Sequence, residues 1–305
     1  MQLGNLTVSQ VSERLRGSGL RLPIGPFVFL IKSPRHEIAE GLLTLYDQFE
    51  LHDDPGFVDF HVQIRHSTGI RRLIRPQSIF DVDGVMPFKP LPGKQALALL
   101  EWGMNWCIYT HAHQFLTIHG AVLEKHGRAL LLPAPSGSGK STLCAALMCR
   151  GWRLISDELI LFSPETKVIH PLARPISLKN RSIDVIRQFA PDATLTEPIP
   201  DTSKGTVALM RPTPASVKNV TTPVAPCMVV FPCYDPNSDT ILTPVPKAEV
   251  FMQLIQNAFN YSILGPLGFG AMAALVERVE GCTARYSSLD EMVVAMDERI
   301  TQADA

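Results

Sequence analysis

The sequence has little that would direct the chain to nucleic acid, to a membrane or to a disulfide framework. Its 28 basic and 29 acidic residues give a net charge of −1, so there is no electrostatic case for a general nucleic-acid binder. The six cysteines form no CxxC pair and no Cys/His zinc spacing, which favours reduced structural thiols. The N-terminus lacks the basic start and apolar block of a signal peptide, and no apolar run approaches the length of a membrane span. We therefore expect a cytoplasmic protein that binds neither nucleic acid nor membrane.

The composition is that of a globular protein, with 46% hydrophobic and 19% charged residues among 305. This length predicts about two domains. We expect a small N-terminal α/β domain over residues 1–93, a connecting helix within 94–115 and a second α/β domain over 116–305. In the first domain the pattern predicts a strand at 27–31, a helix at 38–46, a strand at 58–66, a strand near 71–75 and a Pro-rich linker at 87–93.

The second domain should open with a β-hairpin, whose strands cover 116–124 and 128–133. A helix at 140–150 and a strand at 153–156 should follow. The segment 198–214 is polar and carries Pro and Gly, which indicates a loop. The later elements that we expect are strands at 229–232 and 241–244 and helices at 248–260, 270–280 and 289–300.

The strongest functional signal is a phosphate-binding loop between the second hairpin strand and the helix at 140–150. The loop reads Ala-Pro-Ser-Gly-Ser-Gly-Lys-Ser from Ala134 to Ser141, with Ala134 where the general pattern has Gly. Glycines let the backbone N–H groups approach phosphates closely, and the helix start adds free donors. Lys140 should reach the β- and γ-phosphates of ATP, and the Ser141 hydroxyl should ligate Mg²⁺. The nucleotide-binding residues that we expect are Ser136, Gly137, Ser138, Gly139, Lys140, Ser141 and Thr142.

An acidic pair, Asp157 and Glu158, ends the strand at 153–156. Strand–helix–strand crossovers place the second strand parallel to the first, so this strand should end at the same sheet edge as the phosphates. One carboxylate there would hold Mg²⁺ and the other would take a proton from an attacking hydroxyl. The alternative is that Asp157 only caps the next element and Glu158 is a solvated loop residue.

A histidine, His119, lies on the first hairpin strand. If the hairpin turn centres on residues 126–127, His119 sits opposite a residue near Ala134, at the mouth of the loop. A histidine there would orient the γ-phosphate or the attacking group, or assist proton transfer. The alternative is a histidine that is hydrogen-bonded within the sheet.

The order of these motifs resembles the catalytic domain of HPr kinase/phosphorylase, a bacterial serine kinase whose core is related to phosphoenolpyruvate carboxykinase. The matching features are His119-Gly120, the Ser-Gly-Ser-Gly-Lys-Ser run at 136–141 and the acidic pair at 157–158. The segment Asp-Thr-Ser-Lys-Gly-Thr-Val-Ala at 201–208 is similar to the group called HprK-related kinase A. The resemblance covers about 116–300 and implies a P-loop kinase core over this part of the chain.

The resemblance also implies roles for individual residues. Lys140 and Ser141 would handle phosphate and Mg²⁺, Asp157 would be the general base, and Glu158 would be a metal or positioning carboxylate. His119 matches the family histidine. Lys204 would steady the transferred phosphoryl group, or is simply a solvated loop lysine. The E-[IV]-R-G-[LI]-G signature of true HPr kinases is absent, and Lys204-Gly205 stands where an Arg-Gly could be expected.

We therefore expect an ATP- and Mg²⁺-dependent kinase that phosphorylates a serine in a protein or peptide, and the resemblance makes a homo-oligomer plausible. Two other classes stay open. The same loop would serve an ATPase that drives a partner, or a non-catalytic nucleotide sensor. The sequence has no L-S-G-G-Q-like segment of a transporter ATPase and no N-K-x-D motif of a Ras-like GTPase.

Overall fold

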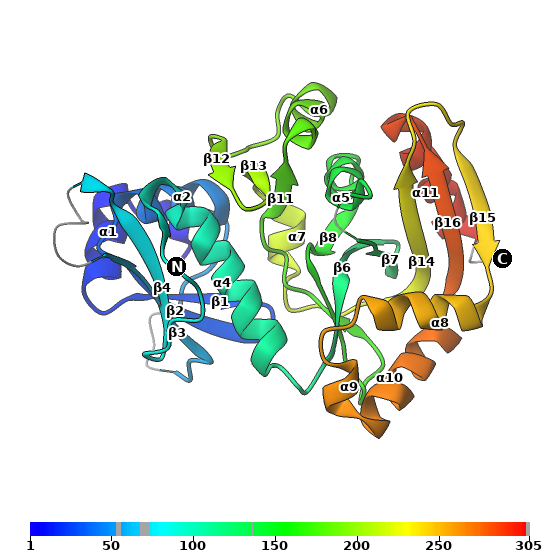
Figure 1. The fold of residues 1–305 in the computed structure, drawn as a ribbon, viewed down its shortest axis with the longest axis horizontal. Coiled ribbons are helices and arrows are strands. Elements are labelled where there is room, and N and C mark those ends of the chain that lie inside the picture. Colours follow the sequence, from blue (N-terminus) through cyan, green and yellow to red (C-terminus); the bar gives the residue numbers. More distant parts are fainter. Residues whose placement is uncertain (53–55, 68–73, 136, 303–305) are drawn as a thin grey trace.

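The computed structural model describes residues 1–52, 56–67, 74–135 and 137–302, and it shows a mixed α/β chain with three β-sheets in this part of the sequence (Figure 1). The N-terminal sheet has the strand order β1-β2-β3-β4-β5. On β1 and β2 every second residue is buried, as expected for strands with one face on the core. The elements of this region are α1 (Val8–Arg16), β1 (Leu20–Ile24), β2 (Phe27–Lys32), α2 (His36–Tyr46), β3 (Phe60–His66), β4 (Gln77–Val82) and β5 (Leu91–Pro92), with 3₁₀ turns at Leu3–Asn5 and Gly93–Gln95.

The strands predicted at 27–31 and 58–66 are confirmed as β2 and β3, and the helix predicted at 38–46 is confirmed as α2. Their ends differ from the prediction by one or two residues. The strand expected near 71–75 falls mostly outside the described residues. The Pro-rich segment at 87–93 is not a free linker, because Leu91 and Pro92 pair with Ser78 and Gln77 and add β5 to the sheet.

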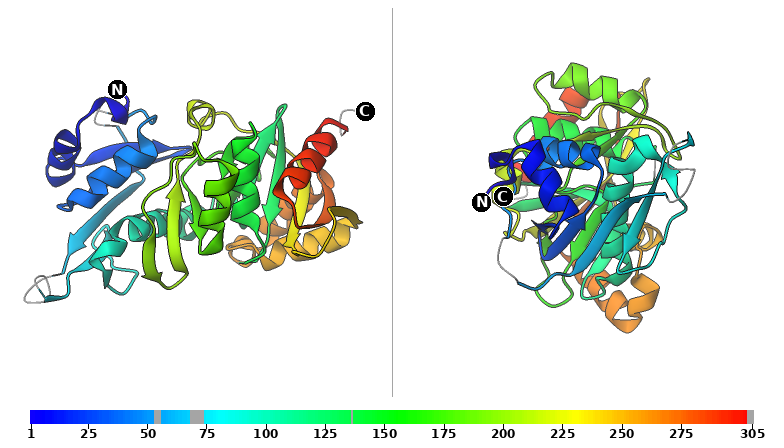
Figure 2. Two further views of the ribbon diagram at one scale, coloured as in Figure 1. Left: turned by 90° about the horizontal axis from the view of Figure 1, so that it is seen from above. Right: turned by 90° about the vertical axis from the view of Figure 1, so that its left-hand side faces the viewer.

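The helix expected between the two halves is α4 (Ala96–His111), which Figures 1 and 2 show lying along the N-terminal sheet on its way to the larger sheet. It is apolar on nearly every side and buried along most of its length. Its hydrophobic cluster joins the N-terminal strands to residues much later in the chain, among them Leu159, Leu172 and Val207. One continuous core therefore connects the N-terminal sheet with the segment around β9 and β13.

The second sheet has eight strands in the described part of the chain, in the order β10-β9-β6-β7-β14-β16-β15, with β8 also paired to β6. The hairpin β6–β7 forms as predicted, and Gly120 pairs with Pro133 next to the loop. Because β6 is antiparallel to both β7 and β8, β7 and β8 run in the same direction, as expected. The strands are β6 (Leu116–Lys125), β7 (Arg128–Pro133), β8 (Arg153–Ser156), β9 (Leu159–Phe162), β10 (Ile169–His170), β14 (Ala225–Tyr234), β15 (Ile241–Val245) and β16 (Glu280–Tyr286).

Helices cover both faces of this sheet. Successive residues of β7 point to opposite faces, so Leu130 and Leu132 pack in the cluster with α5 and α11, whereas Leu131 packs in the cluster with α8 and α10. The helices are α5 (Lys140–Cys149), α6 (Arg181–Phe189), α7 (Pro214–Lys218), α8 (Lys247–Gln256), α9 (Tyr261–Leu264), α10 (Pro266–Glu277) and α11 (Leu289–Gln302).

Three expectations for the later part of the chain are wrong, either in the type of structure or in its bounds. The segment 198–214 is not a loop: β12 (Ile199–Thr202) and β13 (Gly205–Met210) form a hairpin, which pairs with β11 (Ile176–Lys179) in a third sheet of order β11-β13-β12. The helix expected at 270–280 ends at Glu277, and Glu280 begins β16, a strand that the sequence did not reveal. The helix expected at 248–260 ends at Gln256.

Within the described residues, no helix combines the length and the apolar character that a membrane crossing requires.

Candidate active site

The phosphate loop lies at one edge of the large sheet, where several strands end together. Strands β7, β14 and β16 are parallel neighbours, so their carboxyl ends meet at this edge. The loop follows β7, whereas β14 and β16 end at Tyr234 and Tyr286. The N-terminus of α5 begins directly after the loop at Lys140. Its free N–H groups therefore face the space at the sheet edge, where they suit an anion.

Gly139 caps α5 with a φ of +90°, a conformation that side-chain-bearing residues rarely adopt. A Cβ on Gly139 would lie 2.9 Å from Tyr286 Oη and 3.3 Å from the Cβ of Tyr234. Gly137 also has a positive φ, of +93°, and nothing lies within 4 Å of the position of its missing Cβ. The loop thus needs glycine at 139 to pass the tyrosines, and it leaves open space beside Gly137.

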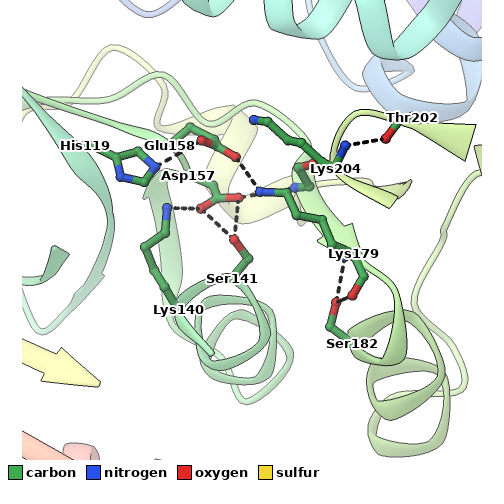
Figure 3. A network of polar contacts seen from close by, with 10 residues as sticks. His119, Lys140, Ser141, Asp157, Glu158, Lys179, Ser182, Thr202 and Lys204 are labelled. Carbon is green, nitrogen blue, oxygen red and sulfur yellow. Dashed lines mark hydrogen bonds and ion pairs between the residues drawn. The ribbon is translucent and has the colours of Figure 1, made fainter. Parts of the chain in front are cut away.

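Lys140, Ser141 and Asp157 form a buried polar cluster at the start of α5 (Figure 3). The Ser141 Oγ lies 3.4 and 3.3 Å from Oδ1 and Oδ2 of Asp157, and Lys140 Nζ lies 3.5 Å from Asp157 Oδ1. The Asp157 side chain is 1% exposed and also accepts a hydrogen bond of 3.2 Å from the backbone N–H of Ser177. These contacts fix the Asp157 carboxylate between the hydroxyl and the ammonium of the loop.

Glu158 faces other partners. Its Oε2 lies 3.2 Å from Nε2 of His119 on β6, and its Oε1 accepts a hydrogen bond of 3.2 Å from Lys179 Nζ on β11. The backbone of Glu158 has a φ of +75°, which is strained for a residue other than glycine. The turn between β8 and β9 therefore directs two adjacent carboxylates to two different sets of groups.

The electrostatic environment keeps Glu158 ionised. Burial acts to raise its pKa, but the hydrogen bond with His119 and the positive charges of Lys140, Lys179 and Lys204 outweigh burial and hold the pKa well below the usual range. Burial lowers the pKa of Lys140, and the carboxylates of Asp157 and Glu158 more than offset it, so the net pKa of Lys140 is raised. At neutral pH the site thus contains the Glu158 carboxylate and the Lys140 ammonium in their charged forms.

Lys204 lies in the turn of the β12–β13 hairpin, and Figure 3 shows its side chain pointing toward Glu158. Its Nζ lies 5.5 Å from the ring centroid of Trp102 on α4. Although the residue is exposed overall, loss of hydration lowers the pKa of its ammonium, and repulsion from Lys179 and Lys140 adds to this effect against the attraction of Glu158. The hairpin therefore brings to the site an ammonium whose pKa is below that of an ordinary lysine.

A cavity of about 840 Å³ lies at the phosphate loop. Most residues that the sequence singled out line it: His119, Gly137, Gly139, Lys140, Ser141, Thr142 and Lys204. The predicted residue Ser136 lies outside the described residues. Asp157 lies behind Lys140 and Ser141 rather than on the cavity wall, and Glu158 lines a neighbouring pocket.

The residues present fit an ATP phosphate group with Mg²⁺. Within the described part of the chain, Lys140 Nζ and Ser138 Oγ are buried without a hydrogen-bond partner, so both can donate to a phosphate. The described residues contain no cluster of three or more His, Cys, Asp or Glu side chains arranged for a metal ion. Proteins hold Mg²⁺ through one or two ligands plus substrate phosphates and water, and the Ser141 hydroxyl and the Asp157 carboxylate are oxygen ligands of this kind.

The sequence did not indicate three residues that the fold brings to the cavity. Lys179 comes from β11 and ion-pairs with Glu158, and Tyr234 and Tyr286 flank Gly139. No local motif marks these positions, because their role depends on how strands distant in the sequence end at one edge. Only a prediction that β14 and β16 lie beside β7 would have found the tyrosines.

Comparison with known proteins gives partial matches. Residues 94–174 match the family model described as SynChlorMet cassette protein ScmC. HPr kinase/phosphorylase from Streptococcus thermophilus is 29% identical over 70 residues, which is 23% of this chain and 23% of the relative, and the protein from Streptococcus salivarius gives the same values. The matched segment thus spans less than a quarter of each curated relative. The solved structure of the Hpr(Ser) kinase/phosphatase from Coxiella burnetii is also similar. The alignment covers 62% of this chain and 99% of that chain, with 10% sequence identity and a TM-score of 0.30.

These matches confirm the resemblance that the motifs predicted: part of this chain is similar to the HPr kinase/phosphorylase family. The likeness to the HprK-related kinase A group, the homo-oligomer and the cytoplasmic location stay predictions.

Proposed function

We propose that the protein is an ATP-dependent kinase that transfers the γ-phosphate to a serine hydroxyl of a protein or peptide. The observation that carries the proposal is that groups suited to bind a phosphate and groups suited to accept a proton lie next to each other at the cavity. Donors for a phosphate, Lys140 and the N–H groups of the loop, lie on one side of the cavity. His119 lines the same cavity, and its hydrogen-bonded partner Glu158 lines the adjoining pocket, from which a hydroxyl would approach.

The phosphate side would hold ATP and Mg²⁺. Lys140 and the loop N–H groups would bind the β- and γ-phosphates, and the hydroxyl of Ser141 with the carboxylate of Asp157, 3.3 Å away, would hold the metal. Mg²⁺ bound there would neutralise charge on the phosphate oxygens. This proposal gives Asp157 the metal-side role that the sequence gave to Glu158, because Ser141 contacts Asp157 and the Asp157 side chain is 1% exposed.

On the acceptor side, Glu158 would take the proton of the attacking hydroxyl, and His119 would orient Glu158. The serine Oγ forms a bond to the γ-phosphorus while the bond from that phosphorus to the β–γ bridging oxygen breaks, so ADP leaves and the proton goes to the Glu158 carboxylate. Lys179, 3.2 Å from Glu158, fixes the carboxylate. Lys204 would balance the charge on the transferred phosphoryl group.

The same phosphate side would also serve an ATPase or a nucleotide sensor, the two alternatives from the sequence. The position of Glu158 favours a kinase: it borders the site and also lines a second pocket, which contains several aromatic side chains and has room for an acceptor.

The test is transfer of label from γ-labelled ATP, with Mg²⁺, to candidate proteins and peptides. We expect a labelled acceptor with the wild-type protein and none with Lys140→Ala, which should also weaken ATP binding roughly tenfold or more. Lys218→Ala, an exposed lysine that does not line the cavity, is the matched control and should behave as wild type. Release of free phosphate that no acceptor changes would instead establish an ATPase, and binding without turnover would establish a sensor.

A further inference from the structure

A second pocket of about 680 Å³ adjoins the phosphate cavity. Its lining includes aromatic side chains from three parts of the chain: the segment before β5, helix α4 and the segment after α8. The aromatic residues are Phe88, Trp102, Trp106, Tyr109 and Phe259. We call this space the aromatic pocket.

The aromatic side chains hold one another in place. Tyr109 stacks on Phe259, with ring centroids 4.6 Å apart and an angle of 12° between the planes, and Trp106 packs edge-on against Phe88 at 6.0 Å. The backbone of Phe259 is tied to the sheet by a hydrogen bond of 2.9 Å to the carbonyl of Thr117. Nevertheless 40% of the Phe259 side chain is exposed. A preformed apolar wall that faces solvent gains free energy when an apolar group covers it.

The aromatic pocket and the phosphate cavity share one wall, formed by His119, Ser203 and Lys204. Glu158, the proposed proton acceptor, also lines the aromatic pocket. A ligand in this pocket would therefore present its polar groups to Glu158 and His119, next to the γ-phosphate position. No other pocket is needed to explain where an acceptor binds.

The charge of the aromatic pocket is positive. The charge of Glu158 is compensated by Lys179, whereas the other charged lining residues are Lys89 and Lys204. Among the described residues, neither lysine has an ion-pair partner within 4.0 Å. An acidic group on the ligand would complement Lys89, while Lys204 lies at the shared wall, beside the site of transfer.

We infer that the aromatic pocket is the acceptor site, and that its substrate is a peptide segment with an aromatic or large aliphatic side chain and an acidic residue close to the acceptor serine. This inference rests on the proposed kinase function and names its substrate class. It also gives the N-terminal region a role, because α4 and residues 88–91 supply much of the pocket wall.

The experiment uses the full-length protein with γ-labelled ATP and a positional-scanning library of peptides, each with a single serine. The wild-type protein should select a bulky apolar residue at one position near the serine and Asp or Glu at another. Phe259→Ala should lower kcat/KM for the selected peptide roughly tenfold or more, through KM for the peptide, and leave KM for ATP unchanged. Lys89→Ala should remove the preference for the acidic residue.

Matched control variants distinguish an effect on the aromatic pocket from a general loss of structure. Phe269 on α10 is 57% exposed, packs edge-on against Phe251 at 5.6 Å and lines neither cavity, so Phe269→Ala should keep wild-type selectivity. Lys94→Ala is the control for Lys89, because Lys94 is exposed and also lines neither cavity.

Binding is measured separately from transfer by tryptophan fluorescence. Two of the three tryptophans, Trp102 and Trp106, line the aromatic pocket, and Trp152 is buried elsewhere. The probe is a peptide pool with Phe and Asp on either side of one serine, added with ADP and Mg²⁺. A fluorescence change that Phe259→Ala abolishes, without transfer to any peptide, would support the pocket and refute the kinase.

Two outcomes would overturn the inference. The first is transfer to peptides with no apolar or acidic preference, or with equal effects of Phe259→Ala and Phe269→Ala; this would leave the kinase function standing. The second is neither a fluorescence change nor transfer with any peptide pool, which would refute the inference and the kinase function together.

Discussion

The Nε2 atom of His119 lies 3.2 Å from Oε2 of Glu158, although the phosphate loop separates the two residues in the sequence. The adjacent carboxylate, Asp157, contacts Ser141 and Lys140 instead. This arrangement makes the two acids experimentally separable, because a substitution of one leaves the partners of the other in place.

Glu158→Gln should lower kcat about 10²- to 10⁴-fold, the usual contribution of a general base, and leave ATP affinity close to wild type. Asp157→Asn should instead raise the Mg²⁺ and ATP concentrations that half-maximal activity requires. Single-turnover transfer together with nucleotide titration distinguishes the two effects. If Asp157→Asn loses transfer with normal ATP binding while Glu158→Gln stays active, the roles assigned from the sequence are right.

The pH dependence of activity should reveal Lys204. Its pKa is lowered, chiefly by loss of hydration, so it loses its proton at a lower pH than an ordinary lysine. If transfer needs the Lys204 ammonium, activity should therefore decrease as the pH is raised, with a midpoint below pH 10.5, the usual lysine pKa. Lys204→Arg stays protonated and should move this limb to higher pH. A pH–rate profile of kcat/KM that is the same for both proteins would show that Lys204 takes no part.

The same profile should show no titration of Glu158 near neutrality. Its pKa lies well below the usual range, because the hydrogen bond with His119 and three lysines outweigh burial. The carboxylate is therefore already ionised at pH 5, and an acid limb in the profile near neutral pH would have to come from another group.

Gly139→Ala should damage the loop in two ways. The positive φ costs about 1–2 kcal/mol for a residue with a Cβ, and the new methyl group would meet Tyr286 Oη at 2.9 Å. We expect weaker ATP binding and a lower free energy of unfolding. The double variant Gly139→Ala/Tyr286→Phe removes the nearest clashing atom and should recover part of the loss, which urea denaturation and nucleotide titration would measure. Equal losses in both variants would mean that backbone strain alone is responsible.

The ion pair between Arg174 and Glu101 should matter more for stability than any surface pair. Both side chains are 5% exposed, their charged atoms lie 2.6 Å apart, and Tyr46 donates a further hydrogen bond of 2.7 Å to Glu101. Glu101→Gln leaves a buried guanidinium without its counter-ion and should cost about 3–5 kcal/mol of unfolding free energy.

The control for this prediction is Glu40→Gln, which breaks an exposed pair with His36. It should change the free energy of unfolding by no more than about 0.5 kcal/mol. Similar midpoints for the two variants in urea denaturation would contradict the importance of the buried pair.

Local sequence patterns predicted the phosphate-loop region well. The strand at 153–156 and the start of α5 at Lys140 agree with the structure residue by residue, because a buried apolar strand, small loop residues and strong helix formers all favour the same local structure. The position of His119 also followed, since a tight hairpin fixes the register of its two strands.

The sequence did not predict the elements whose structure depends on pairing with a strand that is distant in the chain. Residues 200–206 are polar and carry Pro and Gly, which favours a loop, yet residues 199–210 form a hairpin because β11 offers a partner edge. Likewise, nothing local marks Lys179, which becomes a partner of Glu158 only through the third sheet. The sequence also could not show which of Asp157 and Glu158 faces the phosphate loop. That depends on the turn between β8 and β9, in which Glu158 has a positive φ.

The shared hydrophobic cluster has a consequence for synthesis on the ribosome. Helix α4 leaves the exit tunnel before Leu172, Val207 and Val217, which belong to the same core. The part of its apolar surface that these residues cover therefore stays exposed while roughly the next hundred residues are translated, about 5–20 s at usual elongation rates. During that interval the nascent chain would be a natural client for chaperones, and the N-terminal core is completed only when residues far beyond the phosphate loop have emerged.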